Sequence, residues 1–377
     1  MAASHVTSKM TPGMNPVSDP SKMDFSRNPL LVYWEMTQAC GLACKHCRAE
    51  AVPSADPLEL TTQESKKFLD QLLDFGDPLP HVILTGGDPL RRKDIYPIID
   101  YARGIDLDIS ITPAATTELS NDAITKLRDH GIQALGLSLD GSCAEKHDAI
   151  RNVPGTFDRT ICAARHAGHI GVPIQVNTLV SEETADDLPA IYELLRTSFP
   201  VMRWSLFFLI SVGRGKALNE VTPQQGERIM DWVIDLVPNA PFAVKTTEAP
   251  SYRRVAINKM RQDGMAAHDM KKTAVYRGFQ IRDGHGIVFV SNRGDVYPSG
   301  FLPLYSGSVR NGSLKDIYRD SEIFRALHKP NEFHGKCGFC EYSHICGGSR
   351  ARAFAHTGDA LGSDPFCPYQ PEAAVKN

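Results

Sequence analysis

The stretch that decides the fold is Cys40-Gly-Leu-Ala-Cys44-Lys-His-Cys47, which sets three cysteines at C-x3-C-x2-C spacing. It directly follows an apolar, β-rich run at residues 31–36, so we expect a loop at the end of a strand. Three thiolates on one short loop can hold three irons of a [4Fe-4S] cube and leave the fourth iron open. A zinc ribbon would instead need paired C-x2-C knuckles.

Composition excludes several classes of protein. The 377 residues carry 41 basic and 44 acidic side chains, and the net charge of -3 gives no argument for nucleic-acid binding. The best apolar stretch, residues 201–213, is too short to cross a membrane. Residues 1–28 contain no apolar signal segment and are expected to form a flexible tail. These features predict a cytoplasmic, reducing environment, where clustered thiols are more often metal ligands than disulfides.

Six β-rich runs alternate with amphipathic segments, which is typical of repeated βα units. The expected strands are residues 31–36, 81–84, 107–111, 134–139, 173–179 and 203–209. The expected helices are residues 61–75, 94–103, 121–130, 157–170, 185–198 and, later, 223–236. A hairpin is expected at residues 286–297. The pattern predicts an α/β fold with a parallel, barrel-like sheet and functional loops at the carboxyl ends of its strands.

A cysteine loop of this spacing, placed after the first strand of a βα repeat, resembles the radical S-adenosylmethionine (radical SAM) enzymes. The resemblance implies a partial (β/α)6 barrel and a cluster whose open iron binds the amino and carboxylate groups of S-adenosylmethionine (AdoMet). It also implies reductive cleavage of AdoMet to a 5′-deoxyadenosyl radical that abstracts hydrogen from a substrate. The chain has His46 where the family often has an aromatic residue.

A second motif, Gly86-Gly87-Asp88-Pro89, lies at the end of the second strand. It resembles the family's glycine-glycine-acid motif, which is implied to receive the ammonium group of AdoMet. Two glycines let a backbone approach a ligand, and a carboxylate pairs with an amine. Taken without the cysteines, the glycines would indicate a plain turn, so the inference depends on both motifs together.

Four further residues are candidate AdoMet contacts by the same resemblance. Ser138 and Asp140 follow the fourth strand, Arg151 comes soon after, and Asn177 belongs to the fifth strand. They resemble residues that contact the ribose and carboxylate of the cofactor. Considered alone, Ser138 and Asp140 are equally well explained as a strand end and a helix cap.

A second cysteine group lies near the C-terminus: Cys337, Cys340, Cys346 and Cys367. Four thiolates can close a [4Fe-4S] cluster completely, and the spacing resembles the SPASM or twitch domains that hold auxiliary clusters. We expect one auxiliary cluster on these four residues; a structural zinc is the alternative.

Two positions depart from the full two-cluster SPASM pattern, because Ser299 and Ser349 stand where further cysteines are expected. Cys143 and Cys162 have no partner at ligand spacing and are expected to be small buried residues. The predicted organisation is a tail at 1–28, a radical SAM core at 29–215, a helical and basic connecting segment at 216–282, and a small iron-sulfur domain at 283–377.

The tail of the chain resembles the decarboxylases of alternative heme biosynthesis, on the run from Cys346 to Ala353 and on Asp364-Pro365-Phe366-Cys367. The resemblance implies oxidative decarboxylation of a tetrapyrrole precursor. The connecting segment agrees with this, because it has eight basic residues from Arg253 to Arg282, and guanidinium groups pair well with carboxylates. A solvated helix face explains the same residues.

Two alternatives stay open at this stage. One is a SPASM-type maturase that modifies a ribosomally made peptide, although the 28-residue tail is too short to fold into a peptide-recognition domain. The other is a non-catalytic iron-sulfur electron-transfer protein, which would need no amino-acid cradle. The expected partners are a tetrapyrrole or peptide substrate and a reductant such as flavodoxin or ferredoxin, with no nucleic acid and no membrane.

Overall fold

The computed structural model describes residues 23–277 and 280–371. Within them, ten strands form one sheet in the order β10-β9-β8-β1-β2-β3-β4-β5-β6-β7. The strands are β1 (Leu31–Thr37), β2 (His81–Gly86), β3 (Ile109–Ile111), β4 (Ala134–Ser138), β5 (Ile174–Val180), β6 (Arg203–Phe208), β7 (Ala243–Thr247), β8 (Ile287–Val290), β9 (Asp295–Tyr297) and β10 (Gly307–Ser308). Strands β1 to β8 are parallel, and β9 and β10 pair antiparallel. The sheet is not closed, so it is a partial barrel.

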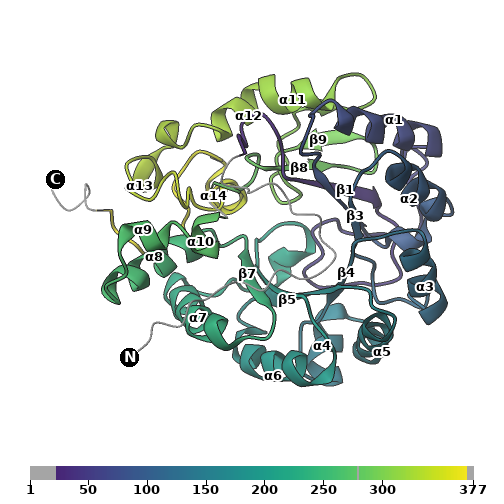
Figure 1. Cartoon of the computed structure of the whole chain (residues 1–377), viewed down its shortest axis with the longest axis horizontal. Helices are drawn as coiled ribbons and strands as arrows, with labels where there is room; N and C mark the ends of the chain where they lie inside the picture. The colour runs from purple at the N-terminus through teal and green to yellow at the C-terminus, as the bar shows by residue number, and fades with distance from the viewer. Residues whose placement is uncertain (1–22, 278–279, 372–377) are drawn as a thin grey trace.

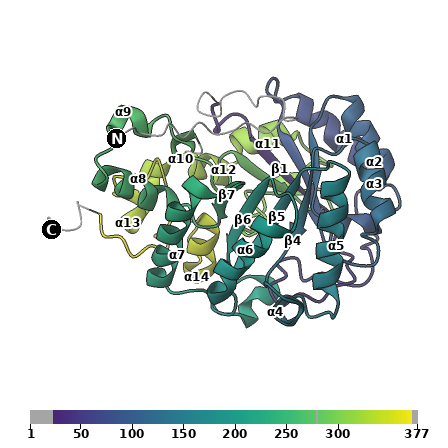
Figure 2. The same ribbon diagram turned by 60° about the horizontal axis from the view of Figure 1, so that its bottom comes forward.

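Helices cover the outside of this curved sheet, as Figure 1 shows. They are α1 (Thr62–Leu73), α2 (Ile95–Gly104), α3 (Asn121–Asp129), α4 (Ala144–Arg151), α5 (Thr156–His169), α6 (Leu188–Ser198), α7 (Pro223–Leu236), α8 (Tyr252–Gln262), α9 (Ala267–Met270), α10 (Ala274–Arg277), α11 (Leu314–Asp320), α12 (Glu322–Leu327), α13 (Gly335–Gly338) and α14 (Arg350–Thr357). Figure 2 shows α2, α3 and α5 along one outer side. Helix α1 begins with a capping box between Thr61 and Glu64.

Side chains along each strand point alternately to the two faces of the sheet. In β1, Val32, Trp34 and Met36 are fully buried in the main hydrophobic core, beneath the helices. Tyr33 and Glu35 therefore point to the opposite, concave face. Polar side chains gather on that face because it borders the interior of the partial barrel, where the candidate site lies.

The predicted α/β class, the partial barrel and its six parallel strands are confirmed. The predicted hairpin also forms, with Phe289 opposite Tyr297, and its Gly294 has a φ of 88°. The structure adds strand β7 and helix α4, which the sequence did not predict. It also places β8 beside β1 in parallel, so the hairpin extends the main sheet.

The division into regions stays a prediction, but two findings bear on it. Strand β7 comes from the connecting segment and β8–β10 from the C-terminal region, and both join the common sheet. Of the predicted tail, residues 1–22 lie outside the described residues, whereas Phe25 is described and only 3% exposed. Among the described residues, no helix is long and apolar enough to span a membrane.

Candidate functional site

The first cysteine loop follows β1 and is held in place by backbone hydrogen bonds. The Cys40 amide donates to Val52 O at 2.8 Å, and the Lys45 amide donates to Ile150 O at 3.0 Å. Two of the sulfurs face amide donors: Leu42 N lies 3.3 Å from Cys40 Sγ, and Ala51 N lies 3.4 Å from Cys47 Sγ. Such N–H groups stabilise thiolates and tune iron-sulfur clusters.

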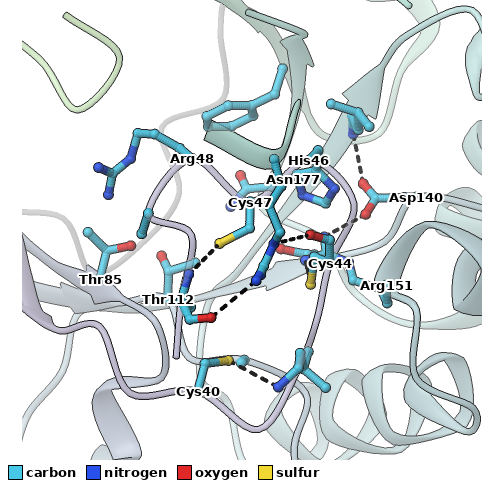
Figure 3. Close-up of a pocket in the computed structure, with 18 of the residues that line it drawn as sticks. Cys40, Cys44, His46, Cys47, Arg48, Thr85, Thr112, Asp140, Arg151 and Asn177 are labelled. Atoms are coloured by element: carbon cyan, nitrogen blue, oxygen red, sulfur yellow. Dashed lines mark hydrogen bonds and ion pairs between the residues drawn. The ribbon is translucent and has the colours of Figure 1, made fainter. Parts of the chain in front are cut away.

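All three of these cysteines line one cavity of about 230 Å³ (Figure 3). Its walls come from the carboxyl ends of successive strands, where functional loops of a parallel barrel converge. The polar or glycine residues contributed by β2 to β5 and the loops after them are Thr85, Gly86, Gly87, Thr112, Ser138, Asp140, Asn177 and Thr178. An apolar wall comes from β6 and the residues after it: Phe207, Phe208, Leu209 and Ile210.

The two glycines of the second motif are required by a close backbone approach. A Cβ atom at Gly87 would lie 2.4 Å from Ala39 O, and one at Gly86, whose φ is 135°, would lie 2.3 Å from Thr37 O. The Gly87 amide donates to Thr37 O at 2.7 Å. The glycines thus let the end of β2 pack against the cysteine loop while lining the cavity.

Asp88 and Pro89 differ from the other predicted contacts, because they are not among the residues that line the cavity. The fully buried Asp88 carboxylate accepts hydrogen bonds from Thr116 Oγ1 at 2.7 Å, Leu90 N at 3.2 Å and Ala114 N at 3.4 Å. Burial raises its pKa although these bonds oppose the rise. In this arrangement Asp88 ties the loop after β2 to the loop after β3.

The other predicted residues, Ser138, Asp140, Arg151 and Asn177, all line the cavity with the cysteines. Arg151 Nη2 pairs with Asp140 Oδ2 at 2.6 Å, and Arg151 Nη1 lies 3.7 Å from Cys44 Sγ. Burial acts to raise the pKa of Asp140, but the positive charge of Arg151, together with His46, His147 and the Leu179 amide, lowers that pKa overall. Figure 3 shows this pair next to Cys44.

Histidines near the site serve the fold or stay neutral. Burial, with help from Arg151, lowers the pKa of His46 to about 4. His147 Nδ1 accepts a hydrogen bond from the Asp140 amide at 3.0 Å. Asp148, its neighbour, accepts from Gly155 N at 2.6 Å and so organises the start of α5.

Sequence reasoning missed two arginines at the cavity. Arg48 forms an ion pair with the buried Glu35 at 2.5 Å and stacks on Phe289, with 4.6 Å from its guanidinium carbon to the ring centre. Arg214 donates to Cys44 O at 3.0 Å. The position of Arg48 directly after Cys47 was the available signal, whereas Arg214 comes from a distant loop and had none.

In the second cysteine group, Cys337 belongs to α13, Cys340 and Cys346 lie between α13 and α14, and Cys367 follows α14. Its sulfurs also face N–H donors: Gly348 N at 3.4 Å from Cys346 Sγ, and Asp364 N at 3.4 Å from Cys337 Sγ. Burial, reinforced by the neighbouring Cys367 thiol, raises the pKa of Cys346 to about 12. Cys337 and Cys367 contribute to the raised pKa values of both Cys340 and Cys346, so the four thiols lie near one another. The cluster on them stays a prediction.

Both serines that replace expected cysteines have structural roles. Ser349 caps α14 and donates from Oγ to Glu248 Oε2 at 2.9 Å. Ser299 Oγ accepts from Phe301 N at 3.3 Å. Glu248 has an unusual positive φ of 59°, and burial, with the charge of Asp283, raises its pKa to about 8.

All nine cysteines are free thiols. Cys143 and Cys162 are exposed, so the prediction that they are buried is wrong: Cys143 lies at the start of α4 and Cys162 on the outer surface of α5. Among the described residues, no three or more His, Cys, Asp or Glu side chains form a group that could hold a single metal ion.

Comparisons with known proteins agree with this geometry. The model of the Radical SAM superfamily matches residues 34–195. The AdoMet-dependent heme synthase of Methanosarcina barkeri is 37% identical over 91% of this chain and 97% of its own length. That of Oleidesulfovibrio alaskensis is 37% identical over 90% of this chain and 87% of its own length.

A solved structure shows the same fold. Streptococcus suis SuiB bound to S-adenosylmethionine superposes with a TM-score of 0.71 at 16% identity, covering 91% of this chain and 78% of SuiB. The chain therefore belongs to the radical SAM superfamily, together with these AdoMet-dependent heme synthases, and so to enzymes that use a [4Fe-4S] cluster and AdoMet.

Proposed function

We propose that this enzyme decarboxylates propionate side chains of a tetrapyrrole precursor of heme, using AdoMet and a [4Fe-4S] cluster held by Cys40, Cys44 and Cys47. The observation that carries the proposal is the convergence of these three thiols with the polar ends of β2 to β5 on one cavity. The heme synthase of M. barkeri supports the substrate class, because the likeness spans 97% of that protein.

When bound, the cluster and AdoMet supply a 5′-deoxyadenosyl radical that abstracts a hydrogen atom from the substrate. The residues of the chain bind and orient AdoMet and the substrate, and they exclude water. Gly86 and Gly87 bring backbone groups to the cavity wall, and Ser138 and Asn177 offer hydrogen-bonding groups to AdoMet. Apolar side chains led by Phe207 keep water from the reacting atoms.

Asp140 and Arg151 organise this site as a unit. Their ion pair is almost fully buried, with side chains 1% and 12% exposed. A buried pair of this kind keeps one geometry, and the Arg151 guanidinium also faces Cys44. We propose that Arg151 fixes the cysteine loop and that Asp140 orients the groups that receive AdoMet.

For the second group, we propose an auxiliary [4Fe-4S] cluster on Cys337, Cys340, Cys346 and Cys367. The amide donors of Gly348 and Asp364 fit cluster thiolates. Conversion of a propionate group to a vinyl group releases one hydrogen atom, one electron and CO2. Four protein thiolates suit an electron-carrying role, because they leave no iron open to bind a substrate.

We propose that the chain is divided into a radical SAM core at 29–215, a connecting segment at 216–282 and an auxiliary-cluster region at 283–377. The nine free thiols favour the cytoplasm, and a flavodoxin or ferredoxin is the expected reductant. A peptide substrate gains no support from SuiB, because a likeness at 16% identity concerns the fold alone.

The test is anaerobic reconstitution with iron and sulfide, followed by incubation with AdoMet, dithionite and an iron porphyrin that carries four propionate groups. We expect about eight irons per chain, formation of 5′-deoxyadenosine, and a porphyrin product that has lost CO2 by mass spectrometry. Formation of 5′-deoxyadenosine with an unchanged porphyrin would refute the substrate. Its absence from a fully loaded chain would refute the radical chemistry and favour an electron-transfer protein.

A further inference from the structure

One row of polar residues crosses the concave face of the sheet from the candidate AdoMet site to the edge strand β7. Strand register aligns Ser138 of β4 with Asn177 of β5, Asn177 with Ser205 of β6, and Ser205 with Lys245 of β7. Residues aligned across parallel strands project from the same face. Lys245 therefore shares its face with two residues that line the AdoMet cavity.

The core-facing neighbours confirm this direction. Trp204 and Leu206, on either side of Ser205, are fully buried in the core beneath the helices, and Val244 packs against the same core. Because side chains alternate along a strand, Ser205 and Lys245 point into the barrel interior. Adjacent strands lie about 4.8 Å apart, so the backbone of Lys245 is roughly 10 Å from that of Asn177, a gap that a bound substrate can span.

The polar groups in this part of the interior lack acidic partners. Within the described part of the chain, the side chain of Lys245 forms no hydrogen bond or ion pair, and the side chain of Arg203, at the start of β6, donates only to Gln175 Oε1 at 3.3 Å. The Ser205 hydroxyl is fully buried and has no hydrogen-bond partner. Arg203 and Lys245 are both partly exposed, so solvent reaches part of each side chain.

Positive charge accumulates here without compensation. Burial lowers the pKa of Lys245 to about 7, and the nearby charges of Arg203 and Arg253 add to that effect. Unpaired, half-buried cations are costly to the fold. Such costs are typical of functional sites, where a ligand of opposite charge completes the arrangement.

We propose that Lys245, Arg203 and the hydroxyl of Ser205 form a subsite that binds a carboxylate group of the substrate inside the barrel. This inference rests on the proposed function, since it assigns the carboxylate to a propionate of the tetrapyrrole. An ammonium, a guanidinium and a free hydroxyl together supply enough donors for both oxygens of a carboxylate. Binding there would hold the porphyrin at a fixed distance from AdoMet.

The basic connecting segment does not provide such a site as a whole. Arg254 pairs with Glu227, Lys259 with Asp235, and Arg261 donates to Tyr342 at 2.7 Å. Arg253, which donates only to backbone oxygens of Ile281 and Ile345, is the member whose charge reaches Lys245. Strands β6 and β7, more than the basic residues between Arg253 and Arg282, therefore supply the carboxylate subsite.

The test is a binding titration of the reconstituted enzyme with porphyrin, in which binding is measured from the change in porphyrin absorbance. Two probes are used: an iron porphyrin with four propionate groups and the same porphyrin as its tetramethyl ester. We expect wild type to bind the acid at least tenfold more tightly than the ester. The K245M variant should lose most of that preference, K245R should retain it, and R203Q should weaken it. The matched control K126M, at an exposed lysine paired with Asp122, should bind both probes as wild type does.

The outcomes separate the two proposals. If K245M and R203Q keep the wild-type preference for the acid, the subsite is wrong while the proposed function stands. If wild type forms 5′-deoxyadenosine but binds neither porphyrin, the tetrapyrrole substrate is wrong and the subsite with it. Circular dichroism of each variant shows whether it has folded. The S205A variant, which removes only a hydroxyl, is a second test. We expect its affinity for the acid porphyrin to fall by a few fold and its affinity for the ester to stay unchanged.

Discussion

Arg151 and Asp140 form a buried ion pair at the carboxyl end of β4, with 2.6 Å between Nη2 and Oδ2. The same guanidinium lies 3.7 Å from the Cys44 sulfur. One side chain of helix α4 thus connects the sheet to the first cysteine group, so the geometry of the cysteine loop depends on a residue more than one hundred positions away in the chain.

The R151M variant should be strongly destabilised, because it leaves the Asp140 carboxylate buried without a counter-charge. Breaking such a pair costs about 3–5 kcal/mol. The double variant R151M/D140L removes both charges and should recover part of that loss. Thermal unfolding of wild type, R151M and the double variant measures this; an R151M variant as stable as wild type would show that the pair is not structurally important.

Replacing Cys40, Cys44 or Cys47 by alanine should abolish AdoMet cleavage. Loss of a direct ligand should exceed the roughly 10–100-fold effect that follows loss of an outer-shell partner. The measurement is 5′-deoxyadenosine formed with dithionite, and C143A, at an exposed cysteine outside both groups, is the control. Full turnover in all three variants would place the cluster elsewhere.

Cys337→Ala should lower the iron content by up to about four atoms per chain, because four thiolates are needed to close the auxiliary cluster. Cleavage of AdoMet without substrate conversion should persist, since the first cysteine group is intact. Iron analysis beside the control C162A tests this. Unchanged iron with bound zinc in wild type would instead support a structural zinc site.

Gly87→Ala should disrupt the first site although it adds only a methyl group. The new Cβ would lie 2.4 Å from Ala39 O and 2.7 Å from Gln38 O, so the cysteine loop must shift. We expect loss of AdoMet binding, measured by equilibrium dialysis. Gly104→Ala is the matched control, because a Cβ there meets nothing within 4 Å; wild-type affinity in Gly87→Ala would contradict the close approach.

Glu248 should make stability depend on pH near neutrality. Its pKa is raised to about 8 by burial and by Asp283, so the folded state holds a proton that the unfolded state loses near pH 4.3. Its stabilising effect is therefore fully present below that unfolded value and is lost as pH rises towards 8, at up to about 1.4 kcal/mol per pH unit. The E248Q variant stays neutral, so its thermal midpoint should exceed that of wild type increasingly from pH 6 to 8.5. A constant difference would contradict the raised pKa.

The strands that sequence predicted are those whose apolar residues recur regularly, such as Val32, Trp34 and Met36 in β1. Strand β7 was missed because Lys245, Thr246 and Thr247 are polar, so the strand has no regular apolar pattern. The pairing of β8 with β1 was also missed, since contacts between residues so far apart leave no local pattern.

The parts of the candidate site that could be predicted are those formed by residues close together in the sequence. Both cysteine groups and the Gly86-Gly87 turn are of this kind. The orientation of Asp88 does not, because it depends on Thr116 in another loop. The exposure of Cys143 and Cys162 depends on which helix surface faces the core, which a lone cysteine does not reveal.

The parallel pairing of β8 with β1 has a consequence for synthesis. Strand β1, which leads into the first cysteine loop, has β2 on one side and residues 287–290 on the other. While the ribosome is still adding the intervening chain, that second edge of β1 stays unpaired, and open strand edges favour aggregation. A product that stops before residue 287 would carry a complete cysteine motif on an incomplete support, so the nascent chain must extend into its last quarter before the first cluster site reaches its final form.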